Sequence, residues 1–133
     1  ERSRIACVFY NRMQAKPARR LETDPTVIYA ATLAEPGFDG NIKRRHLREL
    51  KHPYNTYLTK GLPPGPIASP GKKALQAVFE PETCPYFFFV SKNNGAHQFC
   101  ETLDCHNANV QRWQINYFKS KKAKTEKKNT PPN

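Results

Sequence analysis

Four side chains of the kinds that bind metal ions lie close together in the second half of the chain. They are His97, Cys100, Cys105 and His106. Imidazole nitrogens and thiolates are the ligands that zinc prefers, and a structural zinc site arranges them as a tetrahedron. The spacing lacks the close Cys-x2-Cys pair typical of zinc-binding turns, and His106 falls where a helix is expected to begin. We therefore expect no metal site here.

The cysteines allow a second interpretation, because four of them permit several alternative disulfide pairings. Their spacing does not select one pairing over another; they are Cys7, Cys84, Cys100 and Cys105. Cys7 lies beside Val8 on a predicted helix face and is equally well explained as a small core residue. Free thiols are the default prediction.

Hydrophobic periodicity predicts the helices that must position these side chains. Ile5, Val8, Phe9 and Met13 recur at helical spacing, so residues 2–14 are expected to form an amphipathic helix. Further helices are predicted from cap residues and proline positions: a short one from Asp24-Pro25 through Tyr29, a basic one over residues 42–50, one over residues 70–79 capped by Ser69, and a last one capped by Asp104.

The remaining segments predict a hairpin and a long ordered loop. Residues 52–71 are rich in proline and glycine, which exclude a regular helix or a central strand. Residues 86–90 have the strongest strand pattern in the chain. Turn residues at 93–95 then predict an antiparallel partner strand over residues 97–103. The expected fold class is α+β, a single domain with several short helices around a small antiparallel sheet or hairpin.

The net charge of +11 is unevenly distributed, since residues 119–128 hold six lysines and one glutamate and contribute +5. A basic protein attracts polyanions of any kind, so a nucleic-acid-binding protein is one alternative function. The aromatic residues follow strand and core patterns instead of alternating with basic ones, so no specific nucleic-acid binding is expected. We divide the chain into a domain over residues 1–118 and a disordered lysine-rich tail over residues 119–133.

A set of short sequence strings is more specific than any of these motifs alone. In chain order the strings are Arg4 to Met13, Leu21 to Tyr29, Tyr54 to Tyr57, Gly61 to Gly71, Pro85 to Val90, His97 to Phe99 and His106-Asn107. Together they resemble the YceG-like family of endolytic murein transglycosylases. The resemblance covers nearly all of residues 1–118.

This resemblance implies a parent protein anchored in the inner (cytoplasmic) membrane, with this domain facing the periplasm and the cell wall. The implied reaction cleaves the β-1,4 bond after N-acetylmuramic acid within peptidoglycan glycan strands and leaves a 1,6-anhydro end. Cell-wall synthases are the implied partners. An older name for the family, aminodeoxychorismate lyase, implies pyridoxal chemistry. No Schiff-base lysine or cofactor cradle is evident, so no cofactor is expected.

The resemblance also implies that the chain begins just after its catalytic acid. A lytic transglycosylase can use a single glutamate, because its nucleophile is the 6-hydroxyl of the sugar itself. In the family this glutamate precedes a Glu-Arg pair that corresponds to Glu1-Arg2, so we expect it upstream of Glu1 and expect the chain alone to be inactive. Glu22, at a position where members usually have glutamine, is the candidate acid within the chain.

The residues present are then expected to form the walls of a glycan cleft. Hydrogen bonds to sugar hydroxyl and acetamido groups, or stacking on sugar faces, are expected from Asn11, Glu22, Asp24, Thr26, Tyr54, Asn55, Thr56, Tyr57 and His97. Several also have structural interpretations: Asp24 as a helix cap, Asn55 as a tie for the loop, and His97 as a strand donor. A module that binds peptidoglycan without cutting it is the other alternative function.

Overall fold

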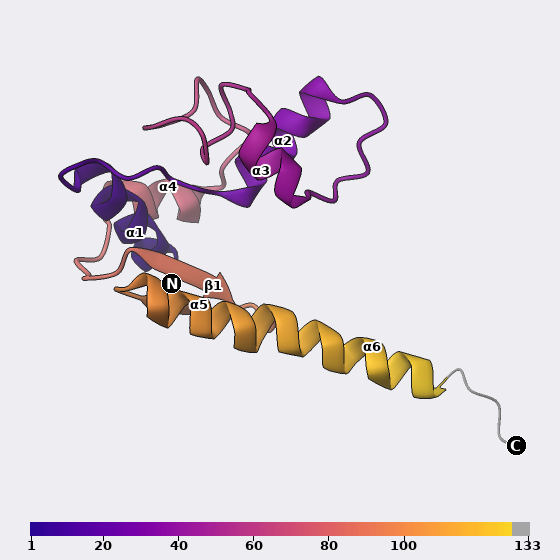
Figure 1. Ribbon diagram of the computed structural model, residues 1–133. Helices are drawn as coiled ribbons and strands as arrows, with labels where there is room; N and C mark the ends of the chain where they lie inside the picture. The colour runs from indigo at the N-terminus through magenta and orange to yellow at the C-terminus, as the bar shows by residue number, and fades with distance from the viewer. Residues whose placement is uncertain (129–133) are drawn as a thin grey trace, which may run out of the picture.

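The computed structural model of the chain describes residues 1–128. Its elements, in chain order, are α1 (Arg2–Gln14), α2 (Asp24–Ala34), α3 (Arg44–Glu49), α4 (Lys72–Phe79), β1 (Phe88–Ser91), β2 (His97–Cys100), α5 (Leu103–Val110), the π-helix η1 (Gln111–Asn116) and α6 (Tyr117–Lys128). In Figure 1, α2 and α3 form one region and the hairpin forms another, and α1 and α4 lie between these two regions. Helix α5 lies along the hairpin. The predicted α+β class, with helices around one antiparallel hairpin, is confirmed.

Helix α1 forms where the periodicity predicts it and is the element against which the hairpin packs. Its buried apolar residues are Ala6, Cys7 and Val8, and Val8 is only 1% exposed. The helix contacts both α4 and β1. The ring of Phe9 meets the ring of Phe89 edge-on, with 5.8 Å between centroids. Such a pair adds to the burial of apolar area that holds helix and strand together.

Helix α2 is longer than predicted, because it runs from Asp24 to Ala34 instead of ending at Tyr29. The extra residues are mostly alanine and leucine, which favour helix, and no glycine or proline occurs between Tyr29 and Pro36. Asp24 is the first helical residue and not the cap. The cap position belongs to Thr23.

The other two predicted caps are also wrong. Thr102, and not Asp104, caps α5, because the Thr102 hydroxyl accepts a hydrogen bond from the backbone N–H of Cys105 at 3.3 Å. A cap side chain must reach the N–H of the third residue ahead of it, and Thr102 has that spacing. The cap position of α4 belongs to Gly71 and not to Ser69, and the helix begins at Lys72 instead of Pro70.

The hairpin is shorter than the strand pattern predicts. β1 and β2 pair antiparallel, with Phe88 opposite Cys100 and Ser91 opposite His97. The backbone N–H of Phe87 still donates to the carbonyl of Cys100, at 3.0 Å. The second strand ends at Cys100 because the chain turns there to begin α5. Val90 of β1 and Cys100 of β2 are the buried residues of the two strands.

The C-terminal helices α5, η1 and α6 form one continuous rod whose far end extends beyond the rest of the molecule (Figure 1). A disordered tail was predicted from residue 119, but α6 continues as helix to Lys128. Lysine and alanine are good helix formers, which accounts for the difference. The part of the prediction that concerns residues 129–133 lies outside the described residues. Within residues 1–128, none of the helices combines the length and apolar character that crossing a membrane requires.

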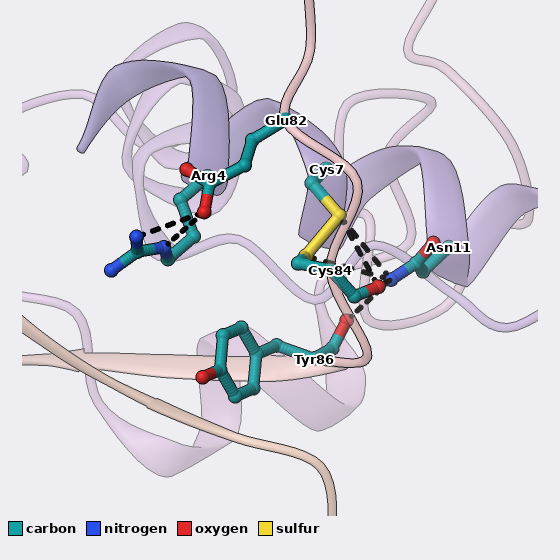
Figure 2. Close-up of a disulfide and its surroundings, with 6 residues drawn as sticks. All are labelled: Arg4, Cys7, Asn11, Glu82, Cys84 and Tyr86. Atoms are coloured by element: carbon teal, nitrogen blue, oxygen red, sulfur yellow. Dashed lines mark hydrogen bonds and ion pairs between the residues drawn. A yellow bond between two sulfur atoms is a disulfide. The ribbon is translucent and has the colours of Figure 1, made fainter.

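All four cysteines are paired, so the default prediction of free thiols is wrong. Cys7 on α1 is bonded to Cys84, and their Cα atoms are 6.2 Å apart (Figure 2). Cys100 at the end of β2 is bonded to Cys105 on α5, with a Cα separation of 5.8 Å. The first disulfide ties the segment before β1 to α1, and the second ties β2 to α5. The hairpin is thus linked covalently to the helix on each side of it.

Candidate functional site

A cleft of about 760 Å³ is lined by α1, residues 21–25, β1, α5 and η1. It brings together four of the residues predicted from the sequence: Glu22, Asp24, Tyr57 and His97. These four come from three separate parts of the chain, so the fold is what places them side by side. The volume is in the range of small-molecule binding sites.

Arg12 fixes the position of Glu22 at the edge of this cleft. The Arg12 side chain is 8% exposed, whereas that of Glu22 is 42% exposed, and the two form an ion pair. Arg12 also donates to the carbonyls of Arg20 and Phe87, both at 2.8 Å. Glu22 has a φ of 53°, a conformation that costs free energy for a residue other than glycine. The contacts with Arg12 help to hold Glu22 in this conformation.

Asp24 and Tyr57 form a second polar pair in the cleft. The Tyr57 hydroxyl donates to Oδ1 of Asp24 at 2.7 Å. Burial, followed by this hydrogen bond to a carboxylate, raises the pKa of Tyr57 well above its usual value. Tyr57 therefore stays protonated and acts as a hydrogen-bond donor. Asp24 serves as its acceptor.

A threonine cluster behind the cleft positions Tyr57. The hydroxyl of Thr56 lies 2.8 Å from that of Thr26 and 3.2 Å from that of Thr23, and it also accepts the backbone N–H of Thr23 at 2.9 Å. Thr56 is fully buried and Thr26 is 8% exposed. Both were predicted to contact glycan. In this structure they join the loop to the start of α2 and so place Tyr57 beside Asp24.

Asn55 is fully buried and ties the proline-rich loop to the end of α3. Its amide donates to the carbonyls of His46 and Leu50 at 3.0 and 2.8 Å, and its side-chain oxygen accepts the backbone N–H of Tyr57 at 3.0 Å. This is the structural interpretation of Asn55 that the sequence left open. The loop is ordered because its buried polar groups are satisfied in this way.

Asn11 and Tyr54 do not line the cleft. The amide of Asn11 donates to the carbonyls of Cys84 and Tyr86, at 2.8 and 2.9 Å, next to the first disulfide (Figure 2). The ring of Tyr54 packs against that of Tyr29, with 4.8 Å between centroids. In this structure Asn11 positions the segment leading into β1, and Tyr54 anchors the loop on α2.

His97 lies at the hairpin end of the cleft with one ring nitrogen engaged. Its Nδ1 is 3.1 Å from Oε2 of Glu1, and its backbone N–H donates to the other carboxylate oxygen at 3.2 Å. The side-chain hydrogen bond with His97, together with the backbone one, lowers the pKa of Glu1. The ring of Phe89 meets the imidazole edge-on at 5.6 Å. These contacts fix the orientation of the ring and leave Nε2 without a hydrogen bond in the described residues.

Sequence reasoning missed several residues of the cleft: Arg12, Phe88, His106, Asn107 and Gln114. Arg12 carried a usable signal, since it lies four residues after Val8 on the buried face of α1, where a charge requires a partner. His106 and Asn107 are part of one of the quoted strings but received no role. Burial, and next the charge of Arg12, lower the pKa of His106, so its imidazole is neutral at neutral pH.

The disulfide between Cys100 and Cys105 changes the chemistry of the suspected zinc cluster. Sulfur atoms joined to each other offer no thiolate to a metal ion. Among the residues that the structure describes, no three His, Cys, Asp or Glu side chains are grouped as metal ligands.

Comparisons with known proteins support one family. The YceG-like family matches residues 1–112. An endolytic murein transglycosylase of Bacillus subtilis (strain 168) is 44% identical over 110 residues, which cover 80% of this chain. A crystal structure of a putative YceG-like protein from Listeria monocytogenes is similar with a TM-score of 0.65 and 40% identity, again over 80% of this chain.

The chain spans less than a third of each of these two proteins. The matched region is 28% of the Bacillus subtilis protein and 32% of the Listeria monocytogenes chain. The comparisons therefore concern one part of a larger architecture in each relative.

Proposed function

This chain belongs to the YceG-like family, and from that premise we propose that it forms part of a lytic transglycosylase that cleaves peptidoglycan glycan strands. The observation that carries the proposal is a cleft lined by Glu22, Asp24, Tyr57 and His97, in a region 44% identical to an endolytic murein transglycosylase. The proposed reaction breaks the β-1,4 bond after N-acetylmuramic acid and leaves a 1,6-anhydro end.

The proposed chemistry needs one carboxylic acid that acts twice. The acid first gives its proton to the oxygen of the glycosidic bond. As a carboxylate it then takes the proton from the 6-hydroxyl of the N-acetylmuramic acid unit. The oxygen of this hydroxyl attacks the anomeric carbon of the same unit and closes the anhydro ring. An acid of this kind requires partial burial, so that it is protonated before the reaction.

Neither of the two carboxylates that line the cleft, those of Glu22 and Asp24, is well suited to be that acid. The carboxylate of Glu22 is paired with the guanidinium of Arg12, and the carboxylate of Asp24 accepts the hydroxyl proton of Tyr57. Groups engaged in this way are suited to hydrogen bonding and positioning. We therefore place the proton donor upstream of Glu1, in accordance with the order of the family's motifs.

The cleft residues are suited to holding a sugar chain. Asp24, His97 and Tyr57 provide hydrogen-bonding groups for hydroxyl and acetamido substituents. Phe88, whose ring stacks on that of His106, lines the same cleft and offers apolar surface to sugar faces. This combination of apolar walls with a few convergent polar groups is typical of ligand sites.

We propose that the parent protein is anchored in the cytoplasmic membrane with this domain on the cell-wall side, where the cell-wall synthases act. The two disulfides support such a location, because disulfides persist mainly in oxidising compartments outside the cytosol. The net charge of +11 favours attraction to anionic wall polymers by the same electrostatics that would attract nucleic acid.

Digestion of purified sacculi tests the proposed function. Residues 1–133 alone should release no 1,6-anhydro muropeptides, and the same domain carrying the residues encoded before Glu1 should release them, as detected by mass spectrometry. Robust release by residues 1–133 alone would contradict an upstream acid. In that case Glu22→Gln should abolish release, which would identify Glu22 as the acid. If the extended form binds sacculi but does not cut them, the result would favour a non-catalytic binding module.

A further inference from the structure

One face of α5 forms a wall of the cleft. The residues that line the cleft from this helix are Leu103, His106, Asn107 and Val110. His106 and Asn107 lie three and four residues after Leu103, and Val110 lies four and three residues after them, so all four are on the same side of the helix. The two apolar residues flank the two polar ones. A buried polar atom on such a face needs a structural partner or a ligand.

His106 has a fixed ring but no hydrogen-bond partner. Its imidazole is stacked on the ring of Phe88, with 5.2 Å between centroids and 25° between planes. Its Nδ1 is buried, and no side chain or backbone group in the described residues bonds to it. The neutral form of the ring offers one donor and one acceptor. The ring is thus oriented in the cleft while its hydrogen-bonding capacity is unused by the protein.

Asn107, the next residue, is also unused by the fold. Its side-chain amide makes no hydrogen bond to another described residue, and it is exposed. The amides of Asn11, Asn55 and Asn109, in contrast, all bond to backbone carbonyls. Asn107 therefore has no structural task comparable to theirs.

We propose that His106 and Asn107 form a glycan-binding subsite on the α5 wall of the cleft. This inference rests on the proposed function and adds to it a pair of residues outside the strand and loop positions already considered. The amide of Asn107 offers a donor and an acceptor, and the imidazole of His106 offers Nε2, since its Nδ1 is buried; these groups match the hydroxyl and acetamido groups of N-acetylated hexosamines. The disulfide at Cys105 and the stack on Phe88 hold this wall in place before the sugar arrives.

Binding of peptide-free glycan strands, prepared from purified sacculi, tests the subsite. In the chain of residues 1–133, His106→Phe keeps an aromatic ring on Phe88 and removes both nitrogens. We expect about tenfold weaker binding with an unchanged thermal midpoint, because one hydrogen bond to the sugar is lost. Asn107→Ala should have an effect of the same order. His106→Gln, which restores a donor and an acceptor, should recover part of the affinity.

His52→Phe is the matched control. The ring of His52 also packs beside an aromatic ring, that of Tyr54 at 5.8 Å, but outside the cleft. Its Nδ1 accepts the backbone N–H of Tyr54 at 3.2 Å, so the thermal midpoint of this variant is measured together with its glycan binding. This variant should bind glycan as the unchanged chain does. If His106→Phe and Asn107→Ala both bind with full affinity, the subsite is refuted while the proposed function stands. If the unchanged chain binds no glycan strands, the subsite is refuted, and the digestion of sacculi by the extended form decides the proposed function separately.

Discussion

Replacing Cys7 and Cys84 together with alanine should lower the free energy of unfolding by roughly 4 kcal/mol. The disulfide joins residues 77 positions apart, so it removes much of the conformational freedom of the unfolded chain. The bond also fixes the segment that leads into β1. The carbonyls of Cys84 and Tyr86 in this segment accept the two hydrogen bonds from the Asn11 amide. Denaturation by urea, followed by circular dichroism under non-reducing conditions, measures the loss.

The second disulfide provides the control for this prediction. Cys100 and Cys105 are only 5 positions apart, so their replacement by alanine should cost roughly 2 kcal/mol, about half as much. Equal losses for the two double variants would show that local packing, and not loop closure, determines the effect. An unchanged stability of the Cys7 and Cys84 variant would contradict the pairing itself.

Arg12→Met should destabilise the domain by about 3 kcal/mol. Methionine fills a similar volume, but the carbonyls of Arg20 and Phe87 and the carboxylate of Glu22 each lose a donor. The guanidinium is almost fully buried, so water cannot replace it freely. The same denaturation experiment measures the change.

Two variants separate the buried guanidinium from general charge effects. Arg19→Met removes an exposed guanidinium that lies 4.4 Å from the ring centroid of Phe87, and it should cost less than about 1 kcal/mol. Glu22→Gln keeps an acceptor for Arg12 on a half-exposed side chain and should also cost no more than about 1 kcal/mol. A loss for Arg12→Met as small as these would refute its role as the organiser of the cleft edge.

Local patterns in the sequence were sufficient for the parts of the fold that depend on neighbouring residues. The apolar spacing from Ile5 to Met13 predicts α1, and the strand pattern with its turn predicts the hairpin. The helix caps were less predictable, because several polar residues compete at each helix start. Thr102 instead of Asp104 caps α5 only because the chain leaves β2 with the geometry that a cap requires.

The candidate site was predictable only where family resemblance pointed to it. Asp24, Tyr57 and His97 line one cleft, and their contact with glycan stays a prediction. Thr56 and Asn55 have the same side-chain chemistry as ligand-binding residues. Their burial depends on how the loop folds onto α2 and α3, which no local pattern encodes.

Nuclear magnetic resonance titration of residues 1–133 with peptide-free glycan strands most directly tests the claim that this cleft binds peptidoglycan glycan. We predict chemical-shift changes concentrated at residues 21–25, at Tyr57 and His97, and on the cleft face of α5, and these changes should persist at high salt. Changes confined to the lysines of α6 that disappear as salt is raised would contradict the claim, because they would show electrostatic attraction alone.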